Sequence, residues 1–261
     1  MSGEIIGLHH WLDTPPGRHL LAWEQARHDE LVADVFGFHA LQLGLPALDG
    51  LRANRMPHRW LALGEAEGQA FSADGLAGTT PGLMAEPVML PFAEASVDLV
   101  VMPHTLELSV DPHAALREVQ RVLVPEGRVV ISGLNPWSLW GLRQRRARLY
   151  QSVGAGGRRY LPEAGEFIAP GRLRDWLQLL DFELESVSYG CFRPAVQSER
   201  WLARWEWMDG LGARWWPVFG AAYITVAVKR VHGARLLEPA WRSASPAVAA
   251  QAQVARRQAR R

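Results

Sequence analysis

The 261-residue sequence contains a single cysteine, Cys191, and a single lysine, Lys229, so arginine supplies nearly all of its positive charge. One cysteine excludes an intramolecular disulfide and fits a reducing compartment, and we expect a cytoplasmic protein. The net charge of +1 argues against a general attraction to nucleic acid. The longest mainly apolar run, residues 215–228, is too short to span a bilayer and contains Pro217 and Gly220. No membrane span and no signal peptide are predicted.

Other patterns are missing as well. No G-x-G-x-x-G follows any expected strand, which argues against a nicotinamide-dependent oxidoreductase. His9 and His10 have no cysteine or carboxylate at ligand spacing, so we expect no metal site. The tail at 232–261 is rich in Ala, Ser, Gln and Arg and has no acidic residue after Glu238, which predicts disorder.

The middle of the chain has a clear strand, helix, strand pattern. Residues 97–102 and 128–132 are short runs rich in Val and Ile, as expected for parallel strands covered on both faces. Between them, Asp111 can cap a helix whose first turn holds Pro112. The apolar positions of that helix fall on one face at spacings of three and four: Leu116, Val119 and Leu123. The pattern predicts a βαβ unit of an open α/β sheet.

Further strands are expected at 40–44, 59–63, 83–85, 183–189 and 222–228, and the last two would form an antiparallel hairpin. Helices are expected at 19–36, with an inward stripe of Leu20, Trp23, Leu31 and Val35, at 170–180, and as helix or loop at 135–150. The predicted fold is a Rossmann-like, seven-stranded, mostly parallel sheet with helices on both faces. We divide the chain into an N-terminal lid or helix (1–38), a core (39–231) with a Trp-rich insertion (190–219), and the tail (232–261).

A set of motifs carries a family resemblance: Glu86, Leu90-Pro91-Phe92, Ser96-Val97-Asp98, Asp111-Pro112, Arg121-Val122-Leu123 and Pro125-Glu126-Gly127. Their order resembles class I S-adenosylmethionine-dependent methyltransferases of the type 11 (UbiE-like) family. Other segments are similar to a divergent bacterial branch, the YafS-like proteins: Phe36-Gly37-Phe38-His39, His104-Thr105-Leu106 and Ser132-Gly133-Leu134-Asn135-Pro136. The resemblance implies methyl transfer from S-adenosylmethionine to a small-molecule substrate.

The cofactor residues follow from that resemblance and from spacing. Gly44 is preferred over Gly64 for the first loop, because 46 residues separate it from Leu90 and leave room for two strands and two helices. Glu65 lies 21 residues after Gly44, close to the separation of about 20 residues between a glycine turn and its ribose carboxylate; Glu67 is the alternative. Glu86 and the adjoining Pro87 would contact the adenine side, and Pro103 the methionine side.

The first loop departs from the family pattern, which has an acidic residue and three alternating glycines, whereas Gly44 is here followed by Leu45, Pro46 and Ala47. His104, at the end of the fourth strand, could take a proton from the methyl acceptor as a catalytic base, or could be a loop histidine bound to backbone. The Trp-rich insertion and the arginines of 143–148 would shape the acceptor side. The competing hypothesis is a methyltransferase-like fold that serves as a non-catalytic binding module.

Overall fold

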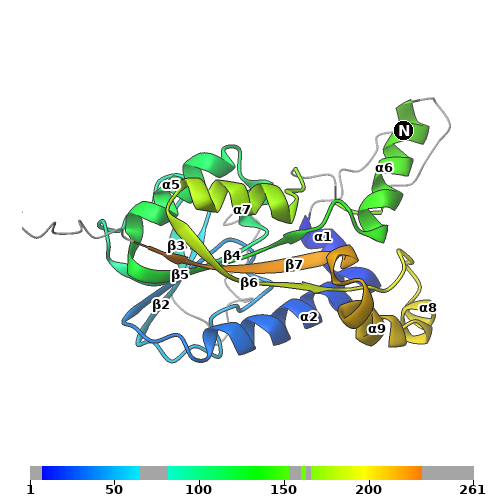
Figure 1. Cartoon of the computed structure of the whole chain (residues 1–261), viewed down its shortest axis with the longest axis horizontal. Coiled ribbons are helices and arrows are strands. Elements are labelled where there is room, and N and C mark those ends of the chain that lie inside the picture. Colours follow the sequence, from blue (N-terminus) through cyan, green and yellow to red (C-terminus); the bar gives the residue numbers. More distant parts are fainter. Residues whose placement is uncertain (1–7, 65–81, 153–159, 163–165, 231–261) are drawn as a thin grey trace, which may run out of the picture. The chain divides into compact units, whose positions relative to one another are not determined.

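The computed structural model describes residues 8–64, 82–152, 160–162 and 166–230 (Figure 1). Its strands are β1 His39–Leu43, β2 His58–Leu63, β3 Gly82–Met84, β4 Val97–Pro103, β5 Leu123–Leu134, β6 Phe182–Gly190 and β7 Ala222–Lys229. Its helices are α1 Leu8–Leu12, α2 Pro15–Val32, α4 Thr105–Leu108, α5 Pro112–Val122, α6 Leu139–Ser152, α7 Pro170–Leu179, α8 Glu199–Arg204, α9 Trp207–Trp215 and the 3-10 turn η2 Pro217–Phe219. The disorder predicted for 232–261 falls outside the described residues.

The strands form one seven-stranded sheet in the order β3-β2-β1-β4-β5-β7-β6. The β1–β2, β1–β4, β2–β3 and β4–β5 pairs are parallel, whereas β7 is antiparallel to β5 and to β6. The predicted sheet and its antiparallel C-terminal pair are therefore confirmed. Since β7 alone is reversed, the carboxyl ends of the other six strands meet at one edge, where α/β folds bind their ligands.

Helices cover both faces of the sheet, with α5 and α7 on one face and α2 on the other (Figure 1). As predicted, the Asp111 side chain caps α5 by accepting from the backbone N–H of Ala114. The helix buries Ala115, Leu116, Val119 and Val122 against strands β4 and β5. Each of the leucine and valine side chains stabilises the fold by roughly 1.5–3 kcal/mol, so this burial holds the helix against the sheet.

The inward face of α2 differs from the predicted stripe. Its buried residues include Leu20, Glu24, His28 and Val32, which recur every four residues, while Trp23 and Leu31 are only half-buried. The prediction placed apolar residues on this face, but two ionisable side chains take its central positions. One oxygen of Glu24 is bonded to His104, and the ring of His28 is bonded to the backbone carbonyl of Glu24. Both ionisable residues belong to the candidate site.

Three helices lie at the carboxyl edge of the sheet, because α6 follows β5 there, and α8 and α9 follow β6 (Figure 1). The helix α6 begins at Leu139, four residues later than the earliest predicted start, because the side-chain oxygen of Asn135 accepts from the N–H of Trp137 and holds a turn before it. Within the described residues, no helix is both long and apolar enough to cross a bilayer.

Candidate functional site

Four of the predicted site residues follow strands that end at the carboxyl edge: Gly44 after β1, Glu86 after β3, and Pro103 and His104 at the end of β4. These four residues therefore lie at one edge of the sheet, and the roles assigned to them stay predictions. Glu65 and its alternative Glu67 lie outside the described residues, so their assignment to the ribose stays a prediction. Pro87 is half-buried in the turn in which the N–H of Met89 donates to the carbonyl oxygen of Glu86 at 2.9 Å.

The first loop turns sharply at two consecutive left-handed residues, Gly44 (φ 71°) and Leu45 (φ 42°). Glycine adopts this conformation without a Cβ clash, whereas leucine is strained there. Leu45 is held in place by burial, packing with Leu48 against residues of α1 and α2. A loop that buries its own leucines can tolerate Pro46, which explains how the chain dispenses with the three alternating glycines.

The buried amide of Gln42 ties this loop from within. Its nitrogen donates to the carbonyl oxygens of Gly44, Leu45 and Leu48 at 3.2, 3.2 and 2.7 Å, and its oxygen accepts from the N–H of Gly50 at 2.8 Å. Across the adjacent strand end, the hydroxyl of Thr105 donates to the carbonyl oxygen of Leu43 at 2.5 Å. Backbone groups of the first loop are thus hydrogen-bonded to side chains of the protein itself.

The side chain of Glu86 lies beside Gly64, the residue that follows β2. A Cβ built on Gly64 would lie 3.0 Å from one carboxylate oxygen of Glu86 and 3.3 Å from the other. Glu86 is exposed and lines an open cavity of about 600 Å³ together with Met84, Ala85, Met89, Leu90 and Pro91. A carboxylate on an otherwise apolar wall suits a flat base with polar edges. The absence of a side chain at Gly64 leaves room for that carboxylate at the end of β2.

His104 occupies the buried end of β4 in a left-handed conformation (φ 53°). Its Nδ1 lies 2.8 Å from Oε2 of Glu107, and its Nε2 lies 2.9 Å from Oε1 of Glu24 on α2. The second oxygen of Glu107 accepts from the backbone N–H of Leu134, at the end of β5, at 2.6 Å. One buried cluster therefore joins α2, the loop after β4 and the end of β5.

Electrostatics in this cluster favour an imidazolium. Burial alone would lower the pKa of His104, but the carboxylate of Glu24 and the hydrogen bond to Glu107 outweigh it and raise the pKa to about 10. Burial also raises the pKa of Glu107, partly opposed by its bond to His104. For His28, one helical turn from Glu24, burial is the largest influence and lowers the pKa. A charged His104 held by Glu24 and a neutral His28 behind it describe the cluster best.

Sequence reasoning missed Glu24 and Glu107, which complete the surroundings of His104. Neither belongs to a recognised motif. The available signal was the spacing of Leu20, Glu24, His28 and Val32, a four-residue repeat whose middle members are ionisable. With both ring nitrogens held by carboxylates, the side chain of His104 is fully buried, and its role as a base stays a prediction.

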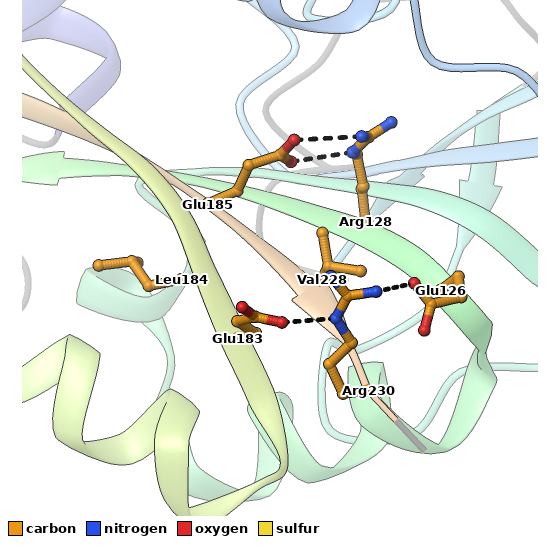
Figure 2. Close-up of a pocket in the computed structure, with 7 residues that line it drawn as sticks. All are labelled: Glu126, Arg128, Glu183, Leu184, Glu185, Val228 and Arg230. Atoms are coloured by element: carbon orange, nitrogen blue, oxygen red, sulfur yellow. Dashed lines mark hydrogen bonds and ion pairs between the residues drawn. The ribbon is translucent and has the colours of Figure 1, made fainter. Parts of the chain in front are cut away.

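A second cavity lies at the opposite, amino edge of the sheet, where β5, β6 and β7 meet (Figure 2). Arg128 donates to Glu185 at 2.9 and 3.1 Å, and Arg230 pairs with Glu183 and Glu126. These pairs are exposed to solvent, which screens them, so they contribute little to stability. The cavity is far along the strands from the ends that carry Gly44 and His104, and we assign it no part in the site. Within the described residues, no three His, Cys, Asp or Glu side chains are grouped as metal ligands.

The residues present fit the two ends of S-adenosylmethionine unequally. The cavity beside Glu86 offers apolar walls and a carboxylate, which fits the adenosine end. At the first loop, where the methionyl end would lie, the carbonyl groups of Gly44 and Leu45 are bonded to Gln42, and Leu45 is fully buried. The methionyl end does not fit this arrangement of the loop.

Comparisons with known proteins agree with the fold. A family model described as a methyltransferase domain matches residues 69–131. The chain is 34% identical over 179 residues to the uncharacterized protein YafS of Escherichia coli K12, over 68% of this chain and 66% of YafS, just under two thirds of that protein.

Two solved structures are similar in fold. One is a SAM-dependent methyltransferase from Thermotoga maritima, with a TM-score of 0.53 and 14% identity, covering 81% of this chain and 92% of that one. The other is a SAM-dependent methyltransferase from Archaeoglobus fulgidus, with a TM-score of 0.53 and 16% identity, covering 80% and 94%. The strand order and these structural similarities show the fold of the class I S-adenosylmethionine-dependent methyltransferases. In sequence, the chain is similar to the methyltransferase-domain family over residues 69–131 and to YafS.

Proposed function

We propose that the protein transfers a methyl group from S-adenosylmethionine to a small-molecule acceptor. The observation that carries the proposal is the position of Glu86: its carboxylate lies at the carboxyl edge, beside the end of β2, on the wall of an open apolar cavity. In an open α/β sheet, that edge is where a nucleotide binds.

In this proposal Glu86 accepts hydrogen bonds from the adenosine end, Pro87 packs against it, and Glu65 receives the ribose hydroxyls. Gly44 and Pro103 flank the methionyl end, which requires the first loop to open from its ties to Gln42. When bound, the cofactor supplies an electrophilic methyl group. The protein aligns the acceptor and excludes water, and many methyl acceptors need no more than that. Should His104 act as a base, its ring would first have to leave Glu24.

Calorimetric titration of the full chain with S-adenosylmethionine and with S-adenosylhomocysteine tests the proposal. We expect micromolar binding that weakens at least tenfold in Glu86→Ala, because a hydrogen bond to a charged group contributes about 1.5–3 kcal/mol. Glu65→Ala should weaken binding similarly. Glu94→Ala is the matched control, since Glu94 is also an exposed glutamate of the segment before β4, and its affinity should be unchanged.

The alternative is a non-catalytic binding module on the same fold. The four hydrogen bonds of Gln42 and the hydrogen bond from Thr105 to Leu43 favour it, because they engage the backbone groups of the first loop within the protein itself. The same titration separates the two candidates. A folded protein that binds neither compound at millimolar concentration would refute methyl transfer and leave the binding module.

A further inference from the structure

The helix α6 is anchored to the protein along one narrow side. Its inward residues are Trp140, Gly141, Gln144 and Ala147. The indole N–H of Trp140 donates to the carbonyl oxygen of Arg193 at 2.8 Å, and the side-chain oxygen of Gln144 accepts from the N–H of Tyr160 at 2.9 Å. The remaining sides of the helix are exposed, so its outward residues do not contribute to the core.

The outward side of α6 is apolar to an unusual degree for a solvent-exposed helix. Leu139, Leu142 and Tyr150 are 47%, 46% and 48% exposed, and Trp137, just before the helix, is 58% exposed. Large apolar side chains that are exposed together often mark an interaction surface. The three helix positions recur at spacings of three and eight, which places them on one side.

Positive charge surrounds this apolar side. The helix contains four arginines, Arg143, Arg145, Arg146 and Arg148, and no acidic residue. The guanidinium of Arg145 lies over the ring of Trp137 at 4.6 Å. At spacings of three and four, Arg145 and Arg146 are neighbours of Leu142 on the helix surface. Cations and apolar groups are therefore interleaved on one face.

A cavity of about 200 Å³ opens on the side of α6 that faces away from these apolar residues. Three arginines contribute to its wall, Arg145 and Arg148 of α6 and Arg172 of α7, together with Pro136, Gly141, Gln144, Glu166 and Phe167. In the part of the chain that is described, none of the three arginines has a carboxylate within 4.0 Å, although Glu166 shares the wall. With one acidic residue against three arginines, the cavity suits a phosphate group, which arginine binds with two parallel hydrogen bonds.

We propose that α6 docks the protein on an anionic lipid bilayer, with Leu139, Leu142 and Tyr150 entering the interface and Arg145 and Arg146, the neighbours of Leu142 on the helix, contacting the lipid phosphates. Aromatic residues and arginines are enriched where a protein meets the membrane interface. Nucleic acid would match the charge but would gain nothing from exposed leucines. An acidic protein is disfavoured because the apolar and cationic positions alternate over one helix rather than form an apolar centre with a charged rim.

The helices at the same edge of the sheet support this choice of partner (Figure 1). Trp201 of α8 and Trp207 and Trp215 of α9 are all exposed. The segment before α8 is joined to α6, because the indole N–H of Trp140 donates to Arg193. Indoles at the headgroup level are the usual anchors of interfacial proteins, so a membrane could receive both sets of side chains at the carboxyl edge.

Co-sedimentation of the full chain with vesicles tests the proposal, using phosphatidylcholine alone and phosphatidylcholine with 30% phosphatidylglycerol. We expect binding to the anionic vesicles and at least tenfold weaker binding to the neutral ones. Arg145→Gln and Arg146→Gln should each lower partitioning about fivefold, as expected for one arginine near an anionic surface. Leu142→Ser should lower it also in high salt, where the electrostatic attraction is screened.

Matched controls keep the test interpretable. Leu179→Ser removes a leucine that is 81% exposed on α7, and Arg117→Gln removes an exposed arginine of α5; both should bind as the parent does. Circular dichroism confirms that each variant is folded. A millimolar concentration of glycerol phosphate should not displace the protein from vesicles, and displacement would show that the arginines bind a free phosphate instead. Equal binding to both vesicle types, no effect of Leu142→Ser, or preferential capture by duplex DNA would each overturn the proposal.

Discussion

The charge state of His104 makes the sharpest prediction, because it ties stability to pH. The folded-state pKa is raised from its ordinary value of 6.5 to about 10. A raised pKa means that the folded protein binds the proton more tightly than the unfolded chain. The stabilisation is therefore fully present below pH 6.5 and is lost as the pH rises towards 10. From about pH 7 to about pH 9.5, the loss amounts to about 3 kcal/mol, at about 1.4 kcal/mol for each pKa unit.

His104→Gln removes this titration while keeping a polar side chain in the cluster. At neutral pH it should cost about 3–5 kcal/mol, because it leaves the fully buried carboxylate of Glu24 without a cation. The free energy of unfolding, measured by urea denaturation across the alkaline range, should then fall by about 3 kcal/mol less in the variant than in the parent protein. His10→Gln, at an exposed position, is the control and should follow the parent. Parallel alkaline profiles for the parent and His104→Gln would refute the assignment of an imidazolium.

Three further substitutions test the packing around the site, each by urea denaturation. Gln42→Ala removes four buried hydrogen bonds from the first loop and should lower the free energy of unfolding by at least about 3 kcal/mol. A decrease below about 1 kcal/mol would contradict a stabilising role for these hydrogen bonds. Gly190→Ala should cost about 1–3 kcal/mol, since its Cβ would lie 1.9 Å from the indole of Trp23, whereas Gly171→Ala, with open space around it, should cost far less. Asp111→Ala should cost about 1 kcal/mol through loss of the α5 cap, and an unchanged midpoint would show that the cap is dispensable.

Much of the sheet could be predicted because its strands are buried on both faces. Val97–Pro103 and Ala222–Lys229 are almost continuously apolar, so length and composition were sufficient to find them. The helix Pro112–Val122 was found from its cap and its apolar spacing. The strand Leu123–Leu134 was predicted to begin only at Arg128, because the sequence Pro125-Glu126-Gly127 is typical of a turn. The structure makes this segment an irregularity inside the strand, with Glu126 at φ 64° and a register shift between Val97 and Leu99.

The site was harder to predict than the fold because its residues act across long separations. Glu24 and His104 are 80 positions apart, and their contact depends on the packing of α2 under the sheet. Periodicity assigns a glutamate to the outside of a helix, since an unpaired buried carboxylate is costly. Only the three-dimensional structure supplies the partner that makes its burial favourable. Gly44 and Glu86, by contrast, were predicted from spacing and from the family resemblance, and they lie just after β1 and β3; their roles stay predictions.

The central claim is that the adenosine end of S-adenosylmethionine binds beside Glu86. Ultraviolet crosslinking of S-adenosylmethionine labelled in its adenine ring to the full chain, followed by peptide mapping, tests it most directly. The account predicts saturable labelling of the peptide that spans residues 82–91, suppressed by excess S-adenosylhomocysteine and reduced in Glu86→Ala. Labelling that does not saturate, or that maps elsewhere and is unaffected by Glu86→Ala, would contradict it.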